Sequence, residues 1–520
     1  MELKDSMTVC FIPFSLECDN VISIMNGSLW ELIEISVDKS FLYPHISKFL
    51  FDNFGVKDEK GINLDNCLVY SLKEDWHGIV SEKEEAIRNL FNNYTLELKT
   101  KQDGKETTEL KYYFRLLNKS MLSPKLVLHP LSSVGFLMFC FEADERSLQF
   151  EDYINLNYYL HKTGKQSPAI RIDKNNENNN KIYSSLRNYN RNNIKPSKKE
   201  DSSDFFYLYN LVSFLLHNFD GLTFLNKENM HLFSYIQINS KDENALANDD
   251  ITNNYIMKNY IRLARCQNTK YMVRPESDSF GDKIYMQTFE NIYIASCVEG
   301  GCIMTDLNHN SPSFMQDFKT APFASRYLWT YMLVYLQRIM LLNLSARLTN
   351  INLALSDSKG AVTDSLLKLS KMKANTYFTD ISDITQHNLF YRFCSQNLSI
   401  RQHFDEVRDK IEDLDIVIKE QELVIKEQEL EIRNKELKQI EEAERNEAKR
   451  TKDLSNKLGF ICIAQVFFAF VAFSGANVEI ECLTKLYNNF KLCIDIVLAV
   501  FATIALVFSL RLIYSIFRKK

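Results

Sequence analysis

A short run of small and polar residues near the C-terminus has the residue types to contact a hydrated cation. Ser474-Gly475-Ala476-Asn477 follows an apolar segment and precedes the acidic residues Glu479 and Glu481. Glycine can break a helix, the Asn477 carbonyl can face a hydrated cation, and the carboxylates would concentrate cations nearby. The candidate pore and selectivity residues are therefore Gly475, Ala476, Asn477, Glu479 and Glu481.

The apolar segment before this run has one face of small and polar residues. Gln465, Ala469, Ala472 and Ala476 share that face, while phenylalanines spread over the rest. Such a face is typical of a pore-lining or helix-contact surface. Gln465, Ala469 and Ala472 are the candidate pore-lining residues, and packing against another helix without a pore is the alternative.

Two apolar segments predict membrane crossings. No charged residue occurs from Leu458 to Val478, and a helix of that length reaches about 31 Å, close to the thickness of the hydrocarbon layer. We interpret 458–478 as the first transmembrane helix, 479–491 as a short external loop and 492–517 as the second transmembrane helix. Two buried helices of a soluble bundle are the alternative.

Basic residues beside both segments predict the orientation. Lys449, Arg450, Lys452 and Lys457 precede the first segment, and a basic tail at 518–520 follows the second. By the positive-inside rule both flanks are cytoplasmic. Since the N-terminus lacks the apolar core of a signal peptide, we expect a multi-pass protein of the inner (plasma) membrane with N- and C-termini cytoplasmic.

Residues 401–457 predict one long helix, which we name the stalk. The range contains no Gly or Pro, and the heptad VIKEQEL at 417–423 recurs at 424–430 and, as EIRNKEL, at 431–437. A seven-residue repeat predicts a coiled-coil-like helix. Its two apolar stripes suit contact with two neighbours, while packing within one subunit is the alternative. The stripes consist of Ile411, Leu414, Ile418, Ile425 and Ile432, and of Ile416, Leu423, Leu430 and Leu437.

The first 400 residues predict an α+β cytoplasmic region. Alternating residues at 94–99 and 108–116 flank Gln-Asp-Gly-Lys and indicate a β-hairpin. The expected parts are an α+β domain at 1–172, an Asn-rich flexible linker at 173–204, a second α+β region at 205–322 and a helical region at 323–400. Within the last region, 324–344 is interrupted by polar residues and is taken as a buried helix, with lipid contact as the alternative.

Few features favour catalysis. No P-loop, nucleophile elbow, clustered metal ligands or catalytic His/Cys pair is present, so we expect no enzymatic activity. Gly300-Gly301 could contact a ligand, although a plain hairpin turn is the more ordinary interpretation. The formal net charge of -5 argues against direct binding of nucleic acid. Cys482 and Cys493 flank the predicted external loop and could pair, or remain free thiols.

The C-terminal features resemble the CorA family of divalent-cation channels. A long helix, a Gly-x-Asn at the end of the first apolar segment, a short acidic loop, a second apolar segment and a basic tail occur in that order over about 400–520. The resemblance implies a homo-oligomer, a pentamer in that family, with Asn477 meeting hydrated Mg²⁺ or another divalent cation as the permeant ion. The family motif is Gly-Met-Asn after an aromatic, whereas this chain has Ser474 and Ala476.

The larger N-terminal region is similar to that of CorA-like membrane effectors associated with type III CRISPR systems. That resemblance implies a nucleotide second messenger, such as an S-adenosylmethionine-AMP conjugate, as activator. An anionic ligand needs cationic and aromatic groups, and a solvated helix face is the alternative for the stretch that offers them. The candidate ligand-binding residues are Lys258, Arg262, Arg265, Lys270, Arg274 and Tyr271.

The leading hypothesis is thus a homo-oligomeric CorA-like channel in membrane lipid, gated through its cytoplasmic region by a nucleotide. The alternatives are a Mg²⁺ or other divalent-cation transporter, and a non-conducting membrane-anchored receptor or scaffold. Apart from the permeant cation and the nucleotide, no cofactor is expected.

Overall fold

A computed structural model describes most of the chain up to Gly475. The described residues are 3–16, 30–33, 35, 39–52, 66–72, 93–102, 105–118, 122–144, 149–164, 167–172, 186, 206–216, 222–239, 249–273, 283–289, 291–307, 313–351, 358–475, 490–491, 495–497, 499–500 and 503. The chain divides into two compact units, 1–419 and 420–520, and each is described by itself.

Unit 1 is built on one mixed sheet. Its strands are β1 (Leu3–Ser15), β2 (Trp30–Leu32), β3 (Leu68–Leu72), β4 (Asn93–Gln102), β5 (Lys105–Leu116), β6 (Lys125–His129), β7 (Val134–Ala143), β8 (Ala169–Ile172), β9 (Phe206–Tyr207), β10 (Thr223–Phe224), β11 (His231–Ile238), β12 (Tyr285–Phe289), β13 (Ile292–Ser296) and β14 (Gly300–Asp306). The main order is β12-β13-β14-β11-β1-β7-β5-β4-β8-β9, and β2, β3, β6 and β10 attach beside it. Strands from the ranges 1–172 and 205–322 therefore share one sheet.

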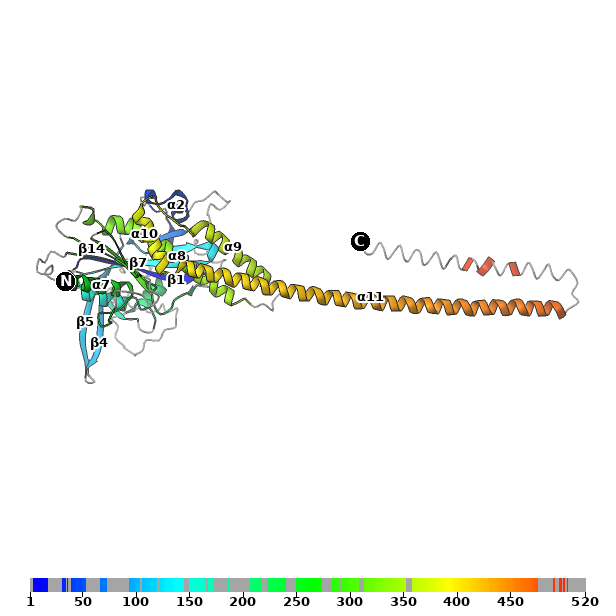
Figure 1. The fold of residues 1–520 in the computed structure, drawn as a ribbon. Helices are drawn as coiled ribbons and strands as arrows, with labels where there is room; N and C mark the ends of the chain where they lie inside the picture. The colour runs from blue at the N-terminus through cyan, green and yellow to red at the C-terminus, as the bar shows by residue number, and fades with distance from the viewer. Residues whose placement is uncertain are drawn as a thin grey trace. The chain divides into compact units, whose positions relative to one another are not determined.

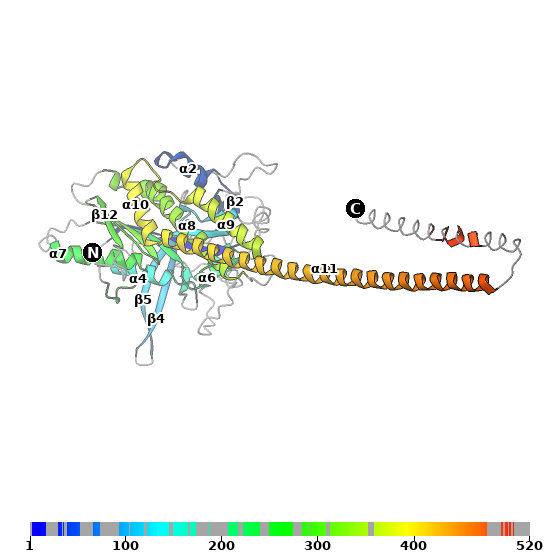
Figure 2. The same cartoon turned by 45° about the vertical axis from the view of Figure 1, so that its right-hand side comes forward.

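Helices cover both faces of this sheet (Figures 1 and 2). One apolar core includes α4 (Phe150–Leu160), α6 (Leu208–Leu215) and α7 (Asp249–Ala264). The other includes α2 (Pro44–Phe51), α8 (Leu328–Thr349), α9 (Ser358–Thr376), α10 (Thr385–Asn397) and the first turns of α11 (Ile400–Gly475). Shorter turns are the 3₁₀ helices η1 (Lys39–Phe41), η3 (Pro130–Ser132) and η6 (Ser313–Met315), and the π-helix η7 (Lys319–Tyr327).

The central strand β1 shows why the sheet needs two covering layers. Cys10, Ile12 and Phe14 belong to the first core, whereas Val9 and Phe11 belong to the second. Successive side chains of a strand point to opposite faces, so a strand that is apolar at consecutive positions must be buried on both. All of these side chains are buried, as that argument requires.

Several local predictions are confirmed. The predicted hairpin is β4 and β5, with Tyr94 opposite Phe114. The apolar stretch 324–344 is a buried helix, α8, preceded by η7. Gly300 and Gly301 follow a tight turn and begin β14, where the Gly300 backbone lies against the Leu232 carbonyl so closely that a Cβ would be 2.5 Å from that oxygen. The glycine pair therefore has a packing role, which favours the hairpin interpretation over a ligand cradle.

The fold class predicted for the C-terminus is corrected. Within the ranges described above, no helix has both the length and the apolarity that a membrane crossing needs. No separate apolar helix begins at Leu458, because α11 runs without interruption from Ile400 and its preceding turns are rich in charge. Of the second predicted crossing, 492–517, only 495–497, 499–500 and 503 are described. The two transmembrane helices, and the inner-membrane location based on them, are withdrawn.

Candidate ligand pocket

The structure does not gather the predicted pore residues into a site. Gln465 and Ala469 are exposed on α11, and Ala472 and Gly475 lie in its last turns. Ala476, Asn477, Glu479 and Glu481 lie outside the described residues, as do Cys482 and Cys493. Their predicted roles depended on the transmembrane helices and are not carried further.

Arg262, from the predicted ligand-binding stretch, has an internal structural role. Its Nη1 donates to Asn259 Oδ1 at 2.7 Å, while its Nε and Nη2 donate to the Tyr271 carbonyl at 3.1 and 2.9 Å. These bonds tie the turn after α7 back to the helix. Its guanidinium is therefore occupied by the fold.

The other members of that stretch do not converge on a ligand either. Lys258 is partly buried on α7, Arg265 has partners within the fold, Lys270 is exposed and Arg274 lies outside the described residues. The Tyr271 ring is half exposed, 6.3 Å from the Tyr158 ring. None of the six lines the pocket described next.

A pocket of about 570 Å³ opens beside the π-helix η7. Its walls come from the β12–β13 turn, η6, η7 and the start of α10. They consist of Phe289, Asn291, Ile292, Phe314, Met315, Phe318, Pro322, Arg326, Tyr327, Gln386 and His387. Its volume lies in the usual range for small-molecule sites, and mostly apolar walls with few polar groups are typical of such sites.

Pro322 explains the unusual helix that forms one wall. Proline has no N–H, so it cannot donate the regular bond to the residue four positions earlier. The Phe323 N–H instead donates to the Phe318 carbonyl at 2.8 Å, a bond across five residues. Short π-helical segments are often found at functional sites, because they move side chains out of the regular helical register. Here the segment places Phe318, Arg326 and Tyr327 on one pocket.

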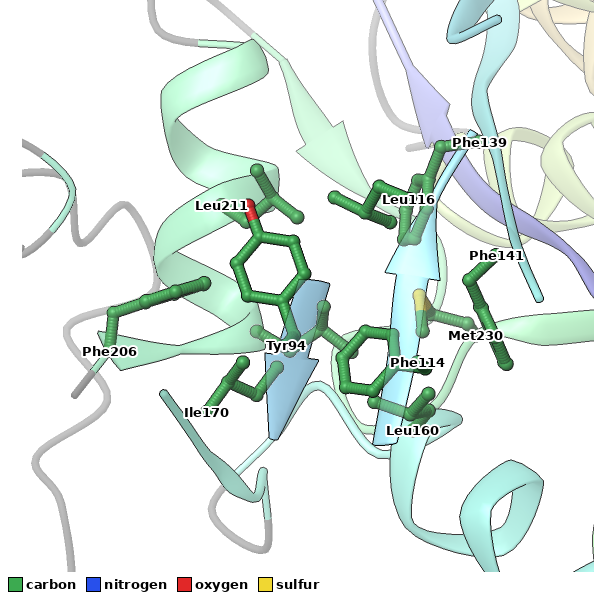
Figure 3. Close-up of a pocket in the computed structure, with 11 residues that line it drawn as sticks. Tyr94, Phe114, Leu116, Phe139, Phe141, Leu160, Ile170, Phe206, Leu211 and Met230 are labelled. Atoms are coloured by element: carbon green, nitrogen blue, oxygen red, sulfur yellow. The ribbon is translucent and has the colours of Figure 1, made fainter. Parts of the chain in front are cut away.

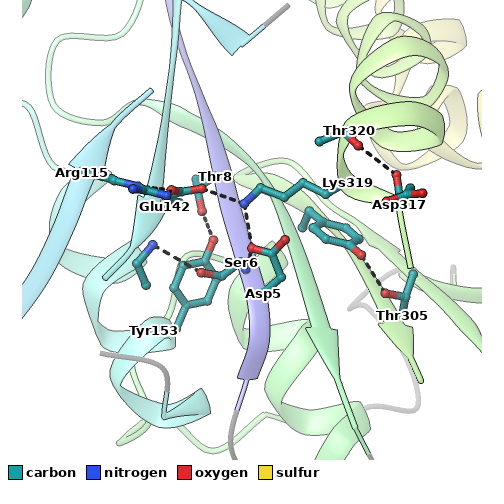
Figure 4. Close-up of polar contacts among 12 residues, drawn as sticks. Asp5, Ser6, Thr8, Arg115, Glu142, Tyr153, Thr305, Asp317, Lys319 and Thr320 are labelled. Atoms are coloured by element: carbon teal, nitrogen blue, oxygen red, sulfur yellow. Dashed lines mark hydrogen bonds and ion pairs between the residues drawn. The ribbon is translucent and has the colours of Figure 1, made fainter. Parts of the chain in front are cut away.

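An ion-pair cluster anchors η7 to the sheet (Figure 4). Lys319 Nζ lies 2.7 Å from Asp5 Oδ1 on β1 and 2.7 Å from Glu142 Oε2 on β7. Arg115 of β5 pairs with the same Glu142 carboxylate. The Lys319 and Glu142 side chains are 13% and 8% exposed, so little solvent screens the pair. The position of the π-helix is thereby tied to three strands.

Aromatic stacking and a histidine form the floor. Phe318 stacks on Tyr327 with ring centroids 5.6 Å apart, and the His387 ring meets Tyr327 edge to face at 5.7 Å. Gln386 Nε2 donates to the Tyr327 hydroxyl. At the mouth, Phe289 and Phe314 are about half exposed. Rings that leave a face in solvent can stack on a planar ligand.

The residues that line the pocket carry a net positive charge. Burial, and then the nearby Arg326 guanidinium, lower the pKa of His387 to about 4, so its imidazole is neutral at neutral pH. Its buried Nδ1 has no hydrogen-bond partner among the described residues. The lining residues include no Asp or Glu, and Arg326, which also has a partner within the fold, is the cationic group among them. An aromatic ligand with an anionic group fits this combination.

Reasoning from sequence missed this site because its parts are far apart. Arg326 is one of the polar residues that interrupt the apolar stretch 324–344, and His387 lies 61 positions further along the chain. Pro322 directly before a helical stretch was the one local signal that could have drawn attention to this wall.

A second pocket is lined by no charged side chain (Figure 3). It lies among β4, β5, β7, α4 and α6, and Tyr94, Phe114, Phe141 and Leu211 are among its lining residues. Its volume is only about 10 Å³, barely room for one water molecule. It is an ordinary packing gap of the core.

Comparison with known proteins gives no match to a family model, a curated protein or a solved structure. Over the part of the chain that the structure describes, no group of three or more His, Cys, Asp or Glu side chains is arranged to hold a metal ion. The pocket beside η7 and the exposed stripes of α11 are therefore the features that indicate a function.

Proposed function

We propose that the chain is a self-associating receptor for a nucleotide-type ligand. The observation that carries the proposal is the pocket beside η7, which joins a guanidinium to half-exposed aromatic rings at a volume suited to a nucleotide. Unit 1 supplies this binding site. In unit 2, α11 supplies the surface through which copies of the chain associate.

Each part of a nucleotide has a partner of suitable chemistry in the pocket. Phe289 and Phe314 offer ring faces for a base, since stacking of a base on an aromatic side chain contributes about 1–3 kcal/mol. Arg326 offers the planar guanidinium that pairs well with phosphate. The Gln386 amide and the His387 Nδ1 offer hydrogen-bonding groups for a base edge.

The self-association surface is the pair of apolar stripes on α11. Ile411 and Ile418 are 2% and 5% exposed against the core, yet Ile425 and Ile432, at the same heptad position, are 54% and 58% exposed. Seven-residue repeats with apolar residues at one position favour association of like helices. Each repeat also carries Lys and Glu, so identical helices can pair opposite charges across the contact. The occupant we propose is a second copy of α11.

Binding measurements test the receptor proposal. Calorimetry with AMP and adenosine should show tighter binding of AMP, and Arg326→Gln should remove most of the difference. Phe314→Ala should weaken both ligands by about 1–3 kcal/mol. Leu366→Ala is the control, because Leu366 on α9 is as exposed as Phe314 and does not line the pocket. Absence of binding at millimolar AMP, or equal binding by Arg326→Gln, would reject the proposal.

A second measurement tests self-association. In sedimentation, the wild-type chain should be an oligomer, and Leu423→Glu with Leu430→Glu should shift it toward the monomer because they place charges on an apolar stripe. Arg433→Gln with Lys426→Gln changes the net charge of the same helix by an equal amount and should leave the oligomer in place. A monomeric wild type would contradict this half of the proposal.

A further inference from the structure

A third pocket, of about 300 Å³, lies where α8 meets the ends of several strands. Its lining includes His161 after α4, His231 at the start of β11 and Glu299 in the β13–β14 turn. Tyr335, Arg338, Ile339 and Leu342 of α8 form the opposite wall. No residue is shared with the pocket beside η7.

Arg338 is the cationic side chain of this pocket, and the fold occupies only part of its guanidinium. Its Nη1 donates to the Leu398 carbonyl at 2.7 Å, and this is its only hydrogen bond among the described residues. A guanidinium has five N–H donors, so most of them remain available. Arg338 is partly buried, and this burial lowers the pKa of its guanidinium. Buried charges in proteins are normally paired.

No acidic group of the pocket completes the pair. Glu299 acts on Arg338 through its charge, but the two side chains form no ion pair within 4.0 Å. The two histidines add no charge of their own near neutral pH, because burial lowers the pKa of His161 to about 4 and, with Arg338, that of His231 to about 3. Both imidazoles are therefore neutral near pH 7.

The rest of the lining narrows the class of ligand. Pro13, Leu225, Tyr335, Ile339 and Leu342 make most of the remaining wall apolar. One guanidinium with an acidic residue nearby suits a single negative charge better than a phosphate dianion. A carboxylate matches the guanidinium in two parallel hydrogen bonds. We propose that this pocket binds a small monocarboxylate with an apolar body, and that Arg338 holds its carboxylate.

Arg338 also links this site to the start of α11. Its acceptor, Leu398, caps α10, and Ser399 then takes a left-handed backbone conformation with φ 56° before α11 begins at Ile400. Left-handed conformations are costly for residues other than glycine. A carboxylate bound to Arg338 restricts the motion of its guanidinium. The same guanidinium donates the hydrogen bond to the Leu398 carbonyl at the α10–α11 turn. Occupancy of the pocket therefore stabilises the α10–α11 turn.

Benzoate, its uncharged analogue benzamide and inorganic phosphate are the probes for the full chain. Calorimetry should show benzoate binding about tenfold or more tighter than benzamide, with phosphate weaker still. Arg338→Met should abolish the preference for benzoate. Equal binding of benzoate and benzamide, tighter binding of phosphate, or no binding would overturn the proposal.

Surface variants keep the test independent of folding. Val298 is half exposed at the pocket rim, so Val298→Glu should weaken benzoate binding several-fold and Val298→Lys should strengthen it. Leu366→Glu makes the same charge change on α9 and should have no effect. Identical affinities of the two Val298 variants would overturn the proposal.

Hydrogen exchange tests the link to α11. Benzoate should slow exchange of the Leu398, Ser399 and His403 amides, which donate to the carbonyls of Cys394, Gln396 and Ser399. In Arg338→Met the same benzoate concentration should leave these rates unchanged. Binding to the wild type without slower exchange at 398–403 would overturn the coupling.

Discussion

Lys319 and Glu142 form an ion pair with a 2.7 Å separation between Nζ and Oε2, almost entirely out of water. The two residues lie 177 positions apart. One begins the π-helix that forms a wall of the ligand pocket, and the other lies on the central strand β7. The pair is therefore a direct link between the sheet and the proposed binding site.

Removal of this link should cost stability and ligand binding together. Lys319→Met leaves the buried Glu142 carboxylate with only the half-exposed Arg115 as partner, so urea unfolding should show a loss of about 3 kcal/mol. Asp5→Asn removes the more exposed partner of Lys319 and should cost about 1 kcal/mol or less. Equal losses for the two variants would contradict the burial argument.

A fall in pH should destabilise unit 1 over the pH range in which its buried histidines take up protons. Burial lowers the pKa of His387 and His161 to about 4 and of His231 to about 3, from 6.5 in the unfolded chain. The unfolded state therefore binds protons first as the pH falls. The stabilisation is complete above about pH 6.5 and is lost as the pH falls to about 4 for His387 and His161 and to about 3 for His231, by about 1 kcal/mol per histidine per pH unit.

Urea unfolding at pH 7.0, 5.5 and 4.5 measures this slope. His387→Gln should reduce it, because it removes one of the histidines whose pKa is lowered in the folded chain. NMR signals of the three histidines that titrate near pH 6.5 in the folded chain would contradict the assignment.

Two glycine replacements should act in opposite directions. In Gly300→Ala the new Cβ meets the Leu232 carbonyl at 2.5 Å and the Ala264 carbonyl at 3.0 Å, so we expect a loss of about 1–3 kcal/mol. At Gly360, on α9, a Cβ meets nothing within 4 Å, and Gly360→Ala should stabilise by about 0.5–1 kcal/mol. Thermal unfolding of both variants measures the contrast. A stable Gly300→Ala would show that the sheet and α7 can separate there.

Local patterns predicted much of the fold. Alternation around Gln-Asp-Gly-Lys located the β4–β5 hairpin, and the absence of Gly and Pro located the long helix α11. The prediction of a transmembrane helix after Leu458 was wrong. It considered the apolar residues alone, whereas in the structure they are the last part of the long, charged helix α11.

Contacts between residues far apart in the chain could not be predicted from local sequence patterns. The parallel pairing of β11 with β14 brings Phe233 beside Gly301, and no short-range pattern encodes that contact. The pocket beside η7 depends on it as well, since Phe233 stacks on Phe323 of the π-helix at 5.0 Å. Arg326 and His387 meet only because these layers pack together.

Photolabelling with 8-azido-AMP tests the central claim most directly, because it locates the nucleotide on the chain. The receptor proposal predicts labelled peptides that contain Phe289, residues 313–327 or residues 385–387, with labelling suppressed by excess AMP and reduced in Arg326→Gln. Labelling confined to other peptides, or labelling that excess AMP does not suppress, would contradict it.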